Sequence, residues 1–187
     1  RIDFPAMKAS YGHGTHNDFV IVFDPNSELS ITTKETAEIC NRQTGIGADG
    51  LIRIVKKNDK WFMDYRNADG SLAEMSGNGI RCLAQAAYIL YGHSGEVSYT
   101  VATDVGPRTV DVQPVNDTTV NASVDMGLIT SLDEPQNWAT LGANPDRPVA
   151  HISVGNPHSV VGVEDVSVVP LQELGEKVPQ VNLEVIQ

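Results

Sequence analysis

The segment from Tyr65 to Arg81 holds the densest set of groups that could do chemistry. An Asn-x-Asp-Gly turn signal at Asn67 precedes Ser76-Gly-Asn-Gly, which leads into an apolar, helix-like stretch. Small residues at a helix N-terminus leave backbone N–H groups open, and with the helix dipole these favour an anion such as a carboxylate. Position 76 is therefore where we expect a nucleophile or a proton-transfer group. Alternatively, the asparagines and the aspartate of this segment serve only as turn and cap residues.

Three further asparagines stand at the ends of strand-like runs: Asn17, Asn156 and Asn182. Pro157 biases Asn156 toward extended backbone, which gives its side chain a defined direction. An amide both donates and accepts hydrogen bonds without carrying charge. A single asparagine at a strand end is usually a turn residue, but three in similar settings suggest amides that converge on a polar substrate.

Residues 12–18 suggest two other kinds of site, a serine-protease site and a metal site. The His13–His16 run resembles the histidine box of subtilisin-like serine proteases, with Ser76 as a nucleophile. In that family the motif opens a helix, whereas the run from Phe19 to Phe23 is typical of a strand, and the family's Gly-Thr-Ser-Met-Ala motif is absent. A metal site of His13, His16 and Asp18 has no recognised ligand spacing, so no metal is predicted.

Short strand-like runs dominate the chain and are the main structural signal. They lie at residues 19–23, 51–55, 61–65, 97–102, 109–115, 120–124, 149–154, 159–163 and 183–186. One helix is predicted from a capping box that begins at Thr32, and it ends before Gly45. Many strands around few helices, without regular βαβ alternation, predict an α+β fold.

A second helix is predicted from about Asn78 to Tyr91, with Gly92 as a left-handed cap. Its interior carries polar side chains only at Arg81 and Gln85. Because the rest of its circumference is apolar, we expect it to be buried nearly all round, as if a curved sheet wrapped it.

Composition excludes several functional classes. The 187 residues include 13 Lys+Arg against 24 Asp+Glu, a net charge of −11, which disfavours nucleic acid or an anionic membrane as the main partner. The apolar runs are far shorter than the roughly 20 residues of a membrane-spanning helix. Cys40 and Cys82 do not make a disulfide framework, so a cytoplasmic location is predicted.

Taken together, these motifs resemble the diaminopimelate epimerase family. The matching segments are Asn17–Phe19, Arg42 with residues 45–50, residues 67–71, Met75–Arg81, residues 124–127, residues 155–158 and Asn182. The resemblance implies two pseudo-symmetric α+β halves, each a curved mixed or antiparallel sheet around a central helix. Residues 1–118 would form a complete first half and residues 119–187 the first part of a truncated second half.

The resemblance also implies an activity. The family interconverts LL- and meso-diaminopimelate, in lysine and peptidoglycan precursor biosynthesis, by two-base proton transfer without a cofactor. The partner is then a small-molecule substrate, diaminopimelate, and the resemblance is compatible with a homodimer.

Roles for individual residues follow from the same resemblance. The substrate α-carboxylate is expected at Gly77 and Asn78, and His158 in a supporting electrostatic role. The substrate-binding amides would be those of Asn17, Asn67, Asn156 and Asn182.

Position 76 departs from the family. Ser76 stands where the family has its first catalytic cysteine, and the second would lie after Gln187. Serine without an activating base is a poor proton acceptor, so we expect the chain as written to be inactive. We expect Cys82 to be a core residue that does not replace the missing thiol. The alternatives are a same-fold isomerase for another substrate, hydroxyproline epimerase-like or PhzF-like, and a non-catalytic amino-acid-binding relative.

Overall fold

The computed structural model describes residues 8–58, 60–142 and 146–187. It confirms the predicted α+β class. The chain divides into two compact units, one that ends at Asp125 and one that runs from Met126 to Gln187. The predicted division near Thr119 falls inside the sequence of the first unit, because the strand that begins there pairs with the sheet before it.

The first unit is built on a seven-stranded mixed sheet whose strands are neighbours in chain order. The pairs β2–β3 and β4–β5 are parallel and the other neighbours are antiparallel. The strands are β1 (Ala9–Gly14), β2 (Asn17–Phe23), β3 (Gly50–Lys57), β4 (Lys60–Asn67), β5 (Val97–Thr103), β6 (Gly106–Asn116) and β7 (Thr119–Val124).

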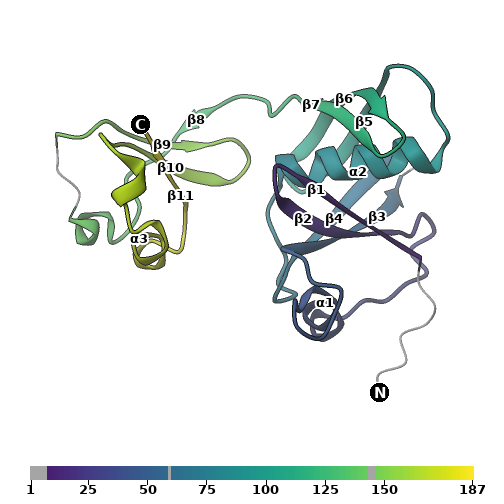
Figure 1. Ribbon diagram of the computed structural model, residues 1–187, viewed down its shortest axis with the longest axis horizontal. Coiled ribbons are helices and arrows are strands. Elements are labelled where there is room, and N and C mark those ends of the chain that lie inside the picture. The colour runs from purple at the N-terminus through teal and green to yellow at the C-terminus, as the bar shows by residue number, and fades with distance from the viewer. Residues whose placement is uncertain (1–7, 59, 143–145) are drawn as a thin grey trace. The chain divides into compact units, whose positions relative to one another are not determined.

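Helix α2 (Gly77–Leu90) contacts β1 to β4 on one side and β6 and β7 on the other, so the sheet curls around it (Figure 1). The predicted burial is confirmed over most of its length, and Ile80 and Ala84 are completely inaccessible. Its last residues, Ile89 and Leu90, are exposed, which the prediction of burial nearly all round did not include. Gly92 follows with a φ of 61°, as its role of left-handed cap requires.

Strand β2 is buried on both faces, which explains why its apolar run is continuous. Val20 and Val22 pack in a cluster with Cys40 at the end of helix α1 (Thr33–Cys40). The alternate residues Phe19 and Ile21 are also buried, and their face of the sheet is the one that α2 covers. The capping box at Thr32 is confirmed, with its hydroxyl accepting from the Glu35 N–H and its own N–H donating to the Glu35 carboxylate.

The second unit holds a four-stranded sheet in the order β11-β10-β9-β8. Its elements are β8 (Thr130–Ser131), η1 (Trp138–Leu141), β9 (Val149–Ser153), β10 (Pro157–Gly162), η2 (Val166–Val168), α3 (Leu171–Lys177) and β11 (Asn182–Ile186). Trp138, Val161 and Val178 form its buried cluster. Like β1-β2-α1-β3, the order β9-β10-α3-β11 is an antiparallel hairpin, a helix and a parallel third strand. This recurrence is consistent with the two pseudo-symmetric halves that the family resemblance implies.

All nine predicted strands and both predicted helices are present. The sequence prediction missed β1, β8, α3 and the two short 3-10 helices. Across the described ranges, no helix has the length and apolar character needed to cross a membrane.

Candidate functional site

The N-terminus of α2 is formed by Ser76 and the three small or polar residues after it. Ser76 is the N-cap in extended backbone, and its Oγ accepts a hydrogen bond from the Gly79 N–H at 3.1 Å. The Ser76 carbonyl accepts the first helical bond, from Ile80 N–H at 2.9 Å. The side chain at position 76 is therefore held beside the open end of the helix, and it is only half-buried.

Two backbone donors remain at this end of α2. Within the described part of the chain, no group accepts a hydrogen bond from the N–H of Gly77 or Asn78. These unpaired N–H groups lie at the positive end of the helix dipole, an arrangement that favours a bound anion. The predicted carboxylate site at Gly77 and Asn78 thus has the donors that it needs.

Space is short around Gly79. A Cβ on this glycine would lie 3.1 Å from Ile52 Cδ1 and 3.3 Å from Ser76 Cβ. A side chain at residue 79 would therefore push against both the core and the residue at position 76. The absence of a side chain lets α2 begin close against β3.

The side chains of Asn17 and Asn78 meet at this end of the helix. Asn78 Nδ2 donates to Asn17 Oδ1 at 3.3 Å, although the residues are 61 positions apart in the chain. Asn78 Oδ1 accepts from the Thr15 hydroxyl at 3.3 Å and from the guanidinium of Arg81. The structure therefore brings together Ser76, Gly77, Asn78 and Asn17.

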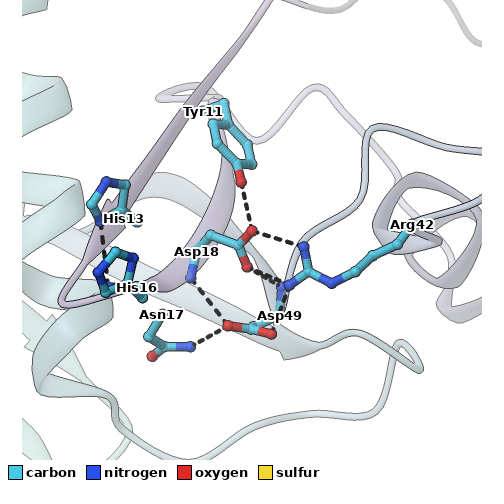
Figure 2. Close-up of polar contacts among 7 residues, drawn as sticks. All are labelled: Tyr11, His13, His16, Asn17, Asp18, Arg42 and Asp49. Carbon is cyan, nitrogen blue, oxygen red and sulfur yellow. Dashed lines mark hydrogen bonds and ion pairs between the residues drawn. The ribbon is translucent and has the colours of Figure 1, made fainter.

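Asn17 also belongs to a charged cluster behind the site, shown in Figure 2. Asn17 Nδ2 donates to Asp49 Oδ2 at 2.9 Å, and Asp49 Oδ1 accepts from Arg42 Nη2 at 2.9 Å. Arg42 forms a bidentate ion pair with Asp18: its Nη1 donates to Oδ2 at 2.9 Å and its Nη2 to Oδ1 at 2.7 Å. The hydroxyl of Tyr11 donates to Asp18 at 2.5 Å.

Asp18 is the buried centre of this cluster, with 7% of its surface exposed. The hydrogen bonds from Arg42 hold its pKa far below the usual range, and Tyr11 and the Asp49 N–H add to the effect. The bond to Asp18 in turn raises the pKa of Tyr11, and the bonds to Asp18 and Asp49 raise that of Arg42. Asp18 and Arg42 therefore stay ionised at neutral pH, and their pair anchors the start of β2.

Asn67 lies at the end of β4, in register with Gly50, which itself pairs with Phe19 near the start of β2. Its side chain donates to Ser71 Oγ at 3.0 Å, and Ser71 donates to Asp69 at 2.6 Å. Asn67 is thus at the same sheet end as Asn17. In the structure its side chain also stabilises the turn of residues 67–71, which is the turn role that the sequence offered as the alternative to substrate binding.

The remaining predicted residues lie together in the second unit. His158 Nδ1 is 2.7 Å from Glu184 Oε1, and its Nε2 is 3.0 Å from Asn156 Oδ1. Asn182 is the register partner of His158 across β10 and β11, and its Nδ2 donates to the Pro157 carbonyl at 3.0 Å. The end of these two strands therefore gathers two amides, an imidazole and a carboxylate.

Neither cysteine lies at an exposed reactive position. Cys40 and Cys82 are free and buried, and burial raises the pKa of each thiol to about 11. Cys82 is a core residue of α2, as predicted. His13 and His16 stack in parallel at 5.4 Å, and the described residues contain no group of three or more His, Cys, Asp or Glu side chains that could hold a metal.

Sequence reasoning gave no role to the cluster behind Asn17. Arg42, Asp49 and Asp18 stand within segments that match the family, Asp18 is also the candidate metal ligand considered above, and Tyr11 belongs to no motif. The usable signal was the pair Asn17-Asp18 at the start of a buried strand, since a buried carboxylate there needs a cation from elsewhere in the chain.

A family model described as "Diaminopimelate epimerase" matches residues 9–131. The diaminopimelate epimerase of Mycolicibacterium gilvum is 39% identical over 173 residues, which are 81% of this chain and 57% of that enzyme. That of Thermobifida fusca is 38% identical over 202 residues, which are 97% of this chain and 71% of that enzyme. The chain thus spans less than three fifths of the first relative and somewhat more of the second.

Solved structures show the same fold at low sequence identity. A protein described as a predicted epimerase from Pseudomonas aeruginosa has a TM-score of 0.68 at 16% identity, over 91% of this chain and 64% of that chain. A hydroxyproline epimerase from Agrobacterium vitis, with bound trans-4-hydroxy-L-proline, has a TM-score of 0.58 at 12% identity, over 87% of this chain and 53% of that chain.

Proposed function

The chain belongs to the diaminopimelate epimerase family, and we propose that it takes diaminopimelate as its substrate and binds the substrate's α-carboxylate at the start of α2. The observation that carries this proposal is the pair of unpaired N–H groups of Gly77 and Asn78, next to the side chain at position 76. A carboxylate on those donors places the α-carbon, one bond away, within reach of position 76.

The chemistry at position 76 is proton transfer at that α-carbon. A thiolate at an N-cap is stabilised by the helix dipole and by the Gly79 N–H that now donates to Ser76 Oγ, so its pKa falls. Such a thiolate removes the α-proton on one face while a second group protonates the other face. The reaction belongs to lysine and peptidoglycan precursor biosynthesis.

Ser76 cannot act in this way. Among the described residues, Ser76 Oγ has the Gly79 N–H as its hydrogen-bond partner and no side-chain base. A hydroxyl without a base to accept its proton stays protonated at neutral pH. We therefore propose that the chain with Ser76 binds substrate but does not exchange its α-proton.

We assign the group in the second unit to substrate binding as well. Asn156 and Asn182 offer amides, and His158 is held between Glu184 and Asn156 in a fixed orientation. The His158 ring would have a supporting electrostatic role, by orienting Asn156 through the contact at its Nε2. Asn17 and Asn67 are the corresponding amides of the first unit.

Ser76 itself favours a second candidate, a relative that binds the amino acid without turning it over. Both candidates bind the carboxylate at the N–H groups of Gly77 and Asn78. They differ only in whether a thiol at position 76 exchanges the substrate's α-proton. A same-fold isomerase for another substrate is not favoured, because the relatives with substantial identity are diaminopimelate epimerases.

The test is Ser76→Cys, made in the full open reading frame and incubated with LL- or meso-diaminopimelate in deuterium oxide. We expect deuterium to enter at the substrate α-carbon, as followed by mass spectrometry, and none with the unmodified protein. The matched control is Ser94→Cys, which places an exposed thiol beyond the opposite end of α2.

Two failures are distinguishable. If Ser76→Cys binds diaminopimelate but incorporates no deuterium, the assignment of position 76 is wrong and the binding relative is the better candidate. If neither the variant nor the unmodified protein binds diaminopimelate, the proposed substrate is wrong.

A further inference from the structure

The amide of Asn17 has one orientation because its neighbour can only accept hydrogen bonds. Asp49 Oδ2 lies 2.9 Å from Asn17 Nδ2 and also accepts from Asp18 N–H at 3.1 Å. An ionised carboxylate has no proton to donate, so the NH₂ group of Asn17, and not its oxygen, must face Asp49. Arg42 Nη2 donates to the other oxygen of Asp49 at 2.9 Å.

The amide of Asn78 is fixed in the opposite sense. Its Oδ1 accepts from the guanidinium of Arg81 and from the hydroxyl of Thr15. A guanidinium can only donate, so the oxygen of Asn78 must face Arg81 and its NH₂ group must face away. That NH₂ group donates to Asn17 Oδ1 at 3.3 Å.

The two amides therefore present opposite groups at the start of α2. Asn17 Oδ1 is an acceptor with a second lone pair free, and Asn78 Nδ2 is a donor with a second N–H free. Both residues are half-buried, so these atoms remain accessible. The donor lies on the same residue as one of the unpaired backbone N–H groups, and the acceptor lies across from it.

We infer that Asp49 and Arg81 are positioning residues. By orienting the amides of Asn17 and Asn78, they set the orientation in which the ammonium and carboxylate groups of an amino acid bind at the start of α2. The substrate ammonium lies on Asn17 Oδ1, and the carboxylate lies on Asn78 Nδ2 and the Gly77 and Asn78 N–H groups. This inference rests on the proposed function and deepens it, because it names the groups that select a zwitterion over a simple carboxylate.

Loss of either charge releases one amide. With Asp49→Asn, the residue at position 49 can donate as well as accept, so Asn17 is free to turn its NH₂ group toward Asn78. Two NH₂ groups would then face each other and no acceptor would remain for the ammonium. With Arg81→Met, the side chain keeps its length but Asn78 loses its charged donor, so the carboxylate side of the site weakens.

The test compares two ligands by calorimetric titration of the full chain: diaminopimelate, and pimelate, the same seven-carbon dicarboxylate without amino groups. We expect Asp49→Asn to weaken diaminopimelate binding about tenfold, the equivalent of about 1.4 kcal/mol, and to leave pimelate binding within about twofold. Arg81→Met weakens both ligands. The matched control is Asp64→Asn, which removes a carboxylate from an arginine pair on the same sheet, at 3.0 Å from Arg53 Nη2.

A ligand-independent measurement accompanies the titration. In ¹H–¹⁵N spectra we expect the Asn17 side-chain NH₂ protons to exchange slowly with water, and to lose this protection in Asp49→Asn but not in Asp64→Asn. If protection does not depend on Asp49, or if Asp49→Asn weakens both ligands equally, the inference is overturned. If the protection behaves as expected but the unmodified chain binds neither ligand, the proposed function fails and the orientation by Asp49 stands.

Discussion

The side chain at position 76 has two roles: it caps the N-terminus of α2, and it occupies the position proposed for proton transfer. Ser76 Oγ accepts from Gly79 N–H, and a sulfur at the same place would meet the same donor and the same helix dipole. Both favour the negative form of the side chain. A thiol placed there should therefore ionise more readily than the two native thiols, whose burial raises the pKa of each to about 11.

We predict that in Ser76→Cys only the new thiol reacts with iodoacetamide at pH 7. Its pKa should lie below the ordinary value of about 8.5, so the reaction rate should reach half its maximum below that pH. Mass spectrometry of the labelled peptides across a pH series measures this directly, with Ser94→Cys as the exposed thiol of ordinary pKa. A half-maximum at or above that of Ser94→Cys would mean that the start of α2 does not stabilise an anion.

Asp18 gives the protein a pH dependence with a definite sign. Its pKa in the folded state is below the ordinary value of about 3.9, mainly because of Arg42. The stabilisation is therefore complete above about pH 4 and is lost as the pH falls further through the folded-state pKa.

We predict that Asp18→Asn lowers the free energy of unfolding at pH 7 by about 1.5–3 kcal/mol, the usual value of hydrogen bonds to a charged group. The variant should also show a smaller loss of stability between pH 5 and pH 2 than the unmodified chain. Urea denaturation at several pH values checks both. Asp117→Asn is the exposed control, and an equal effect of the two substitutions would contradict the buried role of Asp18.

At the scale of elements, the sequence predicted every strand that has an apolar or alternating run, and it missed the exposed β1 and the two-residue β8. The run Phe19–Phe23 is apolar throughout because β2 is covered on both faces, and that signal is unmistakable. Strand β1 is an exposed edge whose sequence, Ala-Ser-Tyr-Gly-His-Gly, has no β-branched residue. It is a strand because it pairs with β2, and such pairing is a tertiary effect that a local pattern does not show.

Helix α3 was missed for a similar reason. It has seven residues, contains Gly175, and its N-cap is Pro170, which makes no side-chain capping hydrogen bond. Helix α1, by contrast, has a complete capping box and was predicted from it. Local signals therefore located the capped helix, while the short one depends on packing in its unit.

The turn of residues 67–71 connects β4 toward α2, and Gly70 is its most restricted residue. Gly70 has a φ of 83°, and a Cβ on it would lie 2.1 Å from the Thr33 carbonyl oxygen. Gly92 also has a positive φ, 61°, but a Cβ there meets nothing within 4 Å. The pair separates backbone strain from crowding.

We predict that Gly92→Ala lowers the free energy of unfolding by about 1–2 kcal/mol, the cost of a left-handed residue with a side chain. Gly70→Ala should cost at least about 1 kcal/mol more, because α1 must move to make room. Urea denaturation of the two variants measures the difference. Equal losses would mean that the turn does not pack against the start of α1 as described.

At the scale of the whole molecule, each compact unit gathers its own group of predicted residues. Ser76, Asn17 and Asn78 gather at the start of α2, and Asn156, His158 and Asn182 gather at the end of β10 and β11. The sequence predicted the members of both groups because asparagines at strand ends and small residues before a helix are local signals.

The sequence could not predict what orients these residues. Asp49 meets Asn17 across 32 positions and Arg42 meets Asp18 across 24, so their contacts exist only once β2 and β3 are paired. The sharing of Asp49 between Arg42 and Asn17 follows from the fold and from no local pattern. The charges that fix the amides therefore became visible only in the structure.

The most direct test of the proposed carboxylate site is a titration of the ¹⁵N-labelled chain with diaminopimelate, followed through the backbone amide signals. We expect the N–H signals of Gly77 and Asn78 to move downfield and to saturate as the carboxylate binds, while Gly92 and Gly95, beyond the other end of α2, stay in place. Saturable binding that leaves the N–H signals of Gly77 and Asn78 unchanged would contradict the assignment of the α2 N-terminus as the carboxylate-binding site.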